Sequence, residues 1–169
     1  MTSTAHHSLA AGPPADPGRQ ARSVVLSRVG RGLVSGAALF QAIGNVTADW
    51  SDSHLFNPDW STHAKFHVGQ TMTLAVLCAG VTLWLCWRPG AFTLSRLRWA
   101  TLFGGLFWVT MAPAAFYPGA GVVDPDSAVQ PLSTGFLPVN QVTVVGSVVL
   151  VLLAAGYRTA RRTLPPSRG

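Results

Sequence analysis

The sequence predicts an all-α membrane protein, a four-helix transmembrane bundle, from three observations. Only 11% of its 169 residues are charged and 49% are hydrophobic, whereas soluble domains have about a quarter charged residues. The chain contains no glutamate. Its apolar residues gather into four windows, each close to the roughly 20 residues that cross about 30 Å of hydrocarbon as a helix. These windows are 29–48, 68–87, 97–117 and 135–157.

The spans divide the chain into three regions. Residues 1–22 are rich in Ala, Ser, Pro and Gly, so we expect a disordered cytoplasmic tail. The membrane domain is expected over 23–160, and a disordered basic tail over 161–169. Cys78 and Cys86 share the second span and lie about 12 Å apart along a straight helix, so they cannot form a disulfide with each other.

The charged residues predict the orientation of the bundle. Cytoplasmic loops are enriched in Lys and Arg near helix ends, and every arginine of this chain falls on one side of the four spans. Both termini are therefore expected in the cytoplasm. The opposite side has Lys65 as its only cation and holds Asp49, Asp52, Asp59, Asp124 and Asp126. The net charge of +6 does not predict nucleic-acid binding, because the arginines flank spans and no nucleic-acid-binding motif accompanies them.

The first span leaves two interpretations open. As a permanent span, it has Gly32 and Gly36 as a small-xxx-small pair that permits close helix approach and allows a homodimer. As a cleaved signal, it would combine two leading arginines, the apolar segment 33–43 and small residues at 46–48. The long leading segment and the polar Gln41 favour the permanent span.

The second span is expected to begin as a helix near Pro58. Asn57 is a good N-cap residue, and proline suits the first helical position. The helix would then place His63 and His67 one turn apart on one face. Lys65 would point away from them, toward anionic headgroups.

Polar residues of all four spans fall at one depth, near the outer headgroups. A polar side chain in a span costs free energy unless it faces a partner or a wet cavity. The pattern therefore predicts a pocket with an apolar floor that suits an amphiphile, although the same groups can also serve as hydrogen bonds between helices. The predicted substrate-binding residues are Gln41, Asn45, Gln70, Tyr117 and Asn140. Asp49 and Asp52 continue the face of Gln41 and Asn45.

Three histidines and nearby aspartates make this level a candidate catalytic site. A histidine paired with an aspartate can transfer protons near pH 7, which suits isomerisation or cyclisation of an isoprenoid, a quinone or another lipid. The predicted catalytic residues are His63, His67, Asp59, Asp52 and His54. His63 and His67, at i and i+4, can also ligate a divalent metal ion, the only cofactor that the pattern indicates.

The segment 54–70 resembles a known signature. Its order His-Leu-Phe-Asn-Pro-Asp-Trp, then His-Ala-Lys-Phe-His and Gln70, is similar to that of small four-helix integral membrane proteins of unknown function from bacteria and fungi. Some of those proteins are automatically labelled acetyltransferases. The resemblance implies the four-span layout and no particular activity, and the chain shows no feature that binds acyl-coenzyme A. Ser61 and Thr62 stand where the signature is expected to have prolines.

The leading functional hypothesis is a membrane-embedded enzyme that acts on a lipophilic molecule at the outer headgroup level. The alternatives are a non-catalytic membrane subunit, a transporter-like protein and a metal-binding membrane protein. The expected partners are the lipid bilayer and a lipophilic small molecule. The chain has no Gly-rich phosphate loop, nucleophile elbow or paired CxxC motif, so nucleotide hydrolysis, serine esterase chemistry and a zinc ribbon lack support.

Overall fold

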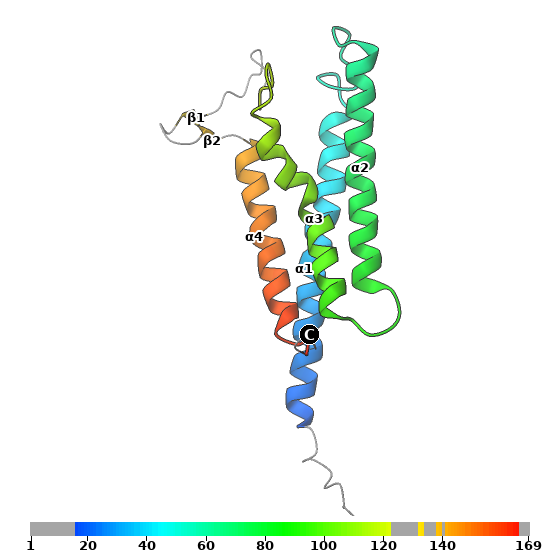
Figure 1. Cartoon of the computed structure of the whole chain (residues 1–169), viewed down its shortest axis with the longest axis vertical. Helices are drawn as coiled ribbons and strands as arrows, with labels where there is room; N and C mark the ends of the chain where they lie inside the picture. Colours follow the sequence, from blue (N-terminus) through cyan, green and yellow to red (C-terminus); the bar gives the residue numbers. More distant parts are fainter. Residues whose placement is uncertain (1–15, 123–131, 134–137, 140, 166–169) are drawn as a thin grey trace, which may run out of the picture.

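The structure, a computed structural model, describes residues 16–122, 132–133, 138–139 and 141–165. Its four helices are α1 (Pro17–Asp49), α2 (Thr62–Trp87), α3 (Leu94–Ala114) and α4 (Gln141–Arg161). Between α3 and α4, the two-residue strands β1 (Leu132–Ser133) and β2 (Pro138–Val139) pair antiparallel. The predicted all-α, four-helix architecture is confirmed (Figure 1).

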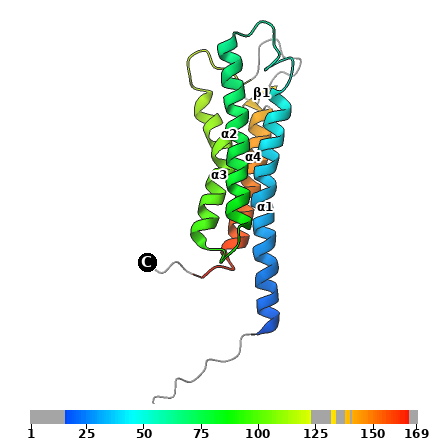
Figure 2. The ribbon, with the colours of Figure 1, turned by 90° about the vertical axis from the view of Figure 1, so that its right-hand side faces the viewer.

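The helices run up and down, and each packs against the next one in the chain (Figures 1 and 2). α4 returns to pack against α1, and α1 also contacts α3. The start of α1 and the end of α4 therefore lie at one end of the bundle, termed the arginine end because the described arginines gather there. The connection 50–61 lies at the other end, termed the histidine end.

Three of the described helices, α1, α2 and α4, are long and apolar enough to cross a membrane. These helices make the chain compatible with a membrane protein. α3 is not among them, because Arg96 and Arg98 occupy its first turns. Its apolar part, 99–114, covers only about 24 Å as a helix.

The helix ends differ from the sequence-based expectations in several places. α1 already begins at Pro17, where the Asp16 side chain accepts a hydrogen bond of 3.0 Å from the Gly18 backbone N–H. Residues 17–22 are therefore helical and not part of a disordered tail, while residues 1–15 lie outside the described residues. α3 ends at Ala114, whereas the expected span ended at 117. α4 runs from Gln141 to Arg161, whereas a span over 135–157 was expected.

The start of α2 was also predicted wrongly. Its N-cap is Ser61, whose hydroxyl accepts a hydrogen bond from the Ala64 backbone N–H. Asn57 instead forms a turn, because its side-chain oxygen accepts from the Asp59 backbone N–H at 2.9 Å. An asparagine before a proline suits either structure. Here the turn is formed, and the connection stays irregular until Ser61.

Helices α1 and α4 approach each other closely at Gly30 and Gly156. A Cβ atom at Gly30 would lie 2.5 Å from the Ala160 backbone nitrogen, and one at Gly156 would lie 2.9 Å from the Gly30 carbonyl oxygen. Gly32 and Gly36, the predicted packing pair, have no atom within 4 Å of such a position. Both predicted glycines are exposed. The helices thus approach each other through a different pair.

The core lies beside this contact, toward the arginine end. It is built from small and aliphatic side chains of all four helices, namely Val34, Ala37, Leu85, Cys86, Ala100, Val149 and Leu153. Small side chains let the helix backbones come close, as is usual in membrane bundles. Cys78 and Cys86 are both buried and free, consistent with the expectation that they do not bridge.

Arg96 fixes the connection between α2 and α3. Its buried guanidinium donates four hydrogen bonds, between 2.8 and 3.4 Å long, to backbone carbonyl oxygens at the end of α2 and in the following turn. The acceptors are Leu85, Arg88, Gly90 and Ala91. Carbonyl groups at a helix C-terminus lack partners within the helix, so this single side chain satisfies a group of them.

Candidate functional site

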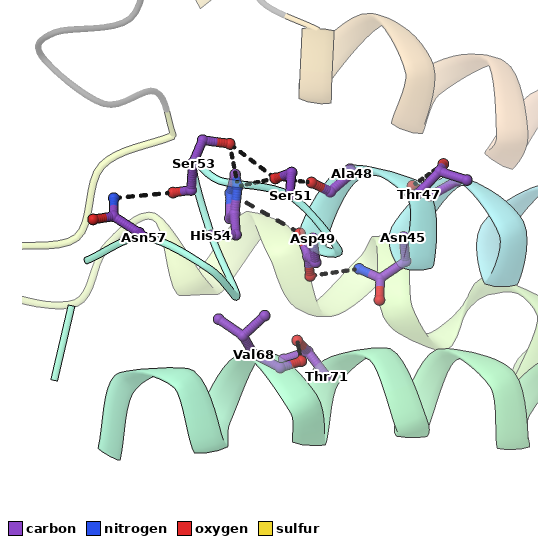
Figure 3. Close-up of polar contacts among 11 residues, drawn as sticks. Asn45, Thr47, Ala48, Asp49, Ser51, Ser53, His54, Asn57, Val68 and Thr71 are labelled. Atoms are coloured by element: carbon purple, nitrogen blue, oxygen red, sulfur yellow. Dashed lines mark hydrogen bonds and ion pairs between the residues drawn. The ribbon is translucent and has the colours of Figure 1, made fainter. Parts of the chain in front are cut away.

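The last residue of α1, Asp49, forms the centre of a polar cluster at the histidine end (Figure 3). One of its carboxylate oxygens accepts a hydrogen bond from the Asn45 amide at 3.4 Å, and the other lies 4.0 Å from Nε2 of His54. Thr71 of α2 faces the same carboxylate. The Asp49 side chain is 17% exposed, so it is mostly shielded from solvent while remaining close to the surface.

His54 joins this carboxylate to two hydroxyl groups of the connecting loop. Its Nδ1 lies 2.8 Å from the Ser53 hydroxyl and 3.5 Å from the Ser51 hydroxyl (Figure 3). The Trp60 ring packs edge-on against the imidazole, with 5.5 Å between ring centroids. When Nδ1–H donates to Ser53, Nε2 keeps its lone pair and can accept a proton near Asp49.

The loop geometry that holds His54 is local. The His54 backbone N–H donates to the Ser51 carbonyl, and the Leu55 N–H donates to the Asp49 carbonyl. The chain therefore folds back directly after α1 ends. This tight return brings the His54 side chain beside the carboxylate of Asp49.

Gln41 and Asn45 continue the polar face of α1 below Asp49. Gln41 is fully buried, and neither atom of its amide finds a protein partner among the described residues. The Asn45 side-chain oxygen is also buried without a partner there. A buried amide without a hydrogen bond costs free energy, most of all in a low-dielectric interior. These two amides are therefore suited to bind a polar group that enters the bundle.

His63 and His67 form a separate pair on α2. Their Nε2 atoms lie 3.1 Å apart, and Nδ1 of His67 lies 3.1 Å from the Gln70 side-chain oxygen. The prediction that the two histidines share a helix face is confirmed. All three side chains are exposed, so the pair lies on the outer surface of α2 and not at the centre of the polar level. No hydrogen bond, ion pair or ring contact among the described residues joins it to Asp49 or His54.

The other predicted site residues that the structure describes do not join either cluster. Asp52 and Asp59 are exposed. Tyr117 is 71% exposed and follows the end of α3. Asn140 lies outside the described residues. Among the described residues, polar contacts at this level join α1, α2 and the loop that connects them.

Four residues of the Asp49 cluster were not among the predicted catalytic or substrate-binding residues, namely Asp49, Ser51, Ser53 and Thr71. Asp49 continues the spacing of four from Gln41 and Asn45, and this spacing was the available signal. Ser53 precedes His54 directly and gave no signal, because the contact of its hydroxyl with the imidazole depends on the loop conformation.

In the described part of the chain, no three His, Cys, Asp or Glu side chains come together as metal ligands. Any metal at His63 and His67 therefore needs further ligands from elsewhere.

Comparisons with known proteins place the chain in a family without assigning an activity. No curated protein and no solved structure matches it. The match to a family described as a family of unknown function, DUF6640, covers residues 33–168. This range includes the three helices α2 to α4, about half of α1 and the whole Asp49 cluster. The chain therefore belongs to DUF6640, a family of unknown function.

Proposed function

We propose that this protein is a membrane-embedded enzyme that transfers protons on a lipophilic substrate such as an isoprenoid, a quinone or an unsaturated lipid. One observation supports this most directly: the shielded Asp49 carboxylate lies 4.0 Å from Nε2 of His54. Two groups that exchange a proton must lie within hydrogen-bond reach, and such contacts commonly shorten when substrate binds.

The pair can isomerise a carbon–carbon double bond without a net change in composition. The protonated Asp49 carboxyl donates its proton to one alkene carbon, which leaves a cation on the neighbouring carbon. Nε2 of His54 then removes a proton from the next carbon, so the double bond re-forms in a new place. The imidazolium returns the proton to Asp49 across the short gap between them.

The amides of Gln41 and Asn45 support binding of an amphiphile beside this pair. Gln41 lies about 12 Å below Asp49 along α1, and its amide has no protein partner in the described chain. A polar group of the substrate would satisfy it. The apolar side chains around it would hold the hydrocarbon part and exclude water from the cation.

The charge distribution supports a position at the outer headgroups. If the arginine end is cytoplasmic, as the excess of arginine near helix ends favours, both termini are cytoplasmic. Asp49 and His54 then lie at the outer surface of the cell membrane. An amphiphile of the outer leaflet would reach them without crossing the bilayer.

Deuterium incorporation into three probe lipids tests this proposal. The full-length protein in lipid nanodiscs is incubated in D₂O with an isoprenoid alcohol, an isoprenoid quinone and an unsaturated phospholipid, and carbon-bound deuterium is measured by mass spectrometry. Asp49→Asn and His54→Gln are each expected to lower incorporation by about 10²- to 10⁴-fold. Asp16→Asn is the matched control, because it removes a carboxylate at the arginine end and asparagine also caps helices well.

Two results would count against the proposal. If both variants fold like the wild type and incorporate as much deuterium, Asp49 and His54 do not transfer the proton. If the folded wild type incorporates no deuterium with any of the three probes, the non-catalytic alternatives, a membrane subunit or a transporter-like protein, gain support.

A second candidate function, transition-metal binding, is favoured by the histidine pair on α2. Two nitrogens bound to one zinc ion at 2.0–2.1 Å in tetrahedral geometry lie about 3.3 Å apart. The Nε2 atoms of His63 and His67 are separated by 3.1 Å, so little movement is needed. Gln70 can accept the Nδ1–H of His67, which leaves Nε2 free to ligate, the usual arrangement around metal-bound histidines.

Metal analysis of untagged full-length protein tests this second candidate. The purified protein is dialysed against zinc, and bound metal is measured by mass spectrometry after gel filtration. His63→Ala and His67→Ala are each expected to abolish bound zinc, while His54→Ala, in the other cluster, keeps it. Equal zinc in all four proteins, or none in the wild type, would exclude the pair as a metal site.

A further inference from the structure

A groove runs along the outer surface between α3 and α4, away from both clusters described above. It has a volume of about 480 Å³. The two helices that form it lie side by side in Figure 1. Its walls are mainly aliphatic, with Leu102, Leu106 and Val109 from α3 and Leu150 from α4.

The depth of the groove results from a glycine. Gly105 is buried in its floor, and a Cβ atom there would lie 3.2 Å from the Leu153 side chain of α4. The absence of a side chain at 105 therefore lets α4 come close to α3 and leaves a hollow between the larger side chains on either side. A hollow of this kind suits a thin, flexible hydrocarbon chain.

The groove has the length of one membrane leaflet. It extends along α3 from Arg98 to Val109, which is about 16 Å at the rise of an α-helix. The hydrocarbon core of a bilayer is about 30 Å thick, so half of it is about 15 Å. The groove therefore matches a single acyl chain of a lipid whose headgroup lies at the arginine end.

The two ends of the groove differ in charge. Arg98 and Tyr157 line the end that faces the arginine end, and the opposite end is aliphatic. Arg98 is exposed and makes no hydrogen bond or ion pair with any described residue. Its neighbour Arg96 instead donates all its bonds to backbone carbonyls. The Arg98 guanidinium is thus placed to bind an anion at the membrane surface, where arginine favours phosphate.

We propose that this groove binds one anionic phospholipid from the leaflet at the arginine end, with an acyl chain between α3 and α4 and its phosphate at Arg98. This site lies at the opposite end of the bundle from Asp49 and His54. The inference does not depend on the proposed enzymatic function.

Native mass spectrometry of the detergent-purified full-length protein tests the proposal. Phosphatidylglycerol and phosphatidylcholine with identical acyl chains are titrated separately, and bound lipid is counted for each protein. The wild type is expected to bind one phosphatidylglycerol more tightly than phosphatidylcholine. Arg98→Gln is expected to lower the affinity for phosphatidylglycerol by about fivefold, the effect of one basic residue near an anionic lipid. Arg28→Gln, an exposed arginine outside the groove, is the matched control.

Filling the groove tests the acyl-chain part separately. Leu102→Trp places a large ring in the groove from an exposed position and is expected to reduce binding of both lipids. Leu74→Trp, equally exposed on α2 and outside the groove, should leave both unchanged. Equal affinity of the wild type for the two lipids, or unchanged binding in Leu102→Trp, would overturn the proposal. A dimer that Leu102→Trp converts to monomer would also overturn it, because the groove would then bind a second copy.

Discussion

Nε2 of His63 and Nε2 of His67 lie 3.1 Å apart on the exposed face of α2. One turn of helix suffices to produce this contact, because residues at i and i+4 are neighbours on a helix surface. The contact between Asp49 and His54 is different, because it requires α1 to end at Asp49 and the chain to fold back directly. The two histidine contacts therefore have separate structural origins.

The first prediction concerns Gln70, which lies beside the exposed histidine pair. Gln70→Leu removes the group that can accept the Nδ1–H of His67, so the imidazole is no longer held with Nε2 directed at a metal. We expect zinc affinity to fall by about 10- to 100-fold, measured by competition with a chromogenic chelator. Gln20→Leu, an exposed change on α1, is the control. An unchanged affinity for Gln70→Leu would show that Gln70 does not orient His67.

The second prediction concerns the glycine contact between α1 and α4. Gly30→Ala places a methyl group 2.5 Å from the Ala160 backbone nitrogen, which backbone atoms cannot accommodate without moving the helices. We expect a loss of roughly 1–3 kcal/mol in the free energy of unfolding, the usual cost of overpacking. Thermal unfolding in detergent measures it, and Gly32→Ala, which meets open space, should show no loss. Equal melting temperatures for both variants would contradict the close approach at Gly30.

The third prediction concerns Arg96. Arg96→Gln removes hydrogen bonds to four carbonyl oxygens at the end of α2 and in the following turn. A hydrogen bond from a charged group contributes about 1.5–3 kcal/mol, and the amide can replace only part of this set. We expect a melting temperature at least roughly 5 °C lower, with Arg28→Gln as the exposed control. If the two variants melt together, the carbonyl groups must find other partners.

The fourth prediction concerns the buried amide of Gln41. Gln41→Leu replaces a group without a protein partner by an apolar one of similar volume. Without added ligand, we expect the melting temperature to rise, because roughly 1–3 kcal/mol of desolvation cost is removed. Asn45→Leu is a useful comparison, since it also removes the hydrogen bond to Asp49 and should stabilise less. A lower melting temperature for Gln41→Leu would show that the amide has a partner in the folded protein.

The amino-acid sequence by itself determined the number of helices, their approximate positions and the gathering of the described arginines at one end of the bundle. These features follow from runs of apolar residues and from the arginines that flank them. Both patterns can be read without knowing which residues are in contact in the folded protein. The pairing of His63 with His67 was also determined by the sequence, because helix geometry alone places them together. The disagreements at helix ends are similar in kind: Asn57 and Ser61 are both good caps, and local sequence does not choose between them.

Only the tertiary structure decided which polar groups meet. The sequence contains Gly30, Gly32 and Gly36 on one helix, and the packing of α4 uses the first of these alone. In the same way, Asp49 rather than Asp52 or Asp59 became the partner of His54, because it ends α1 where the loop turns back. Such contacts depend on how whole helices pack and where loops reverse. Spacing along one segment does not contain that information.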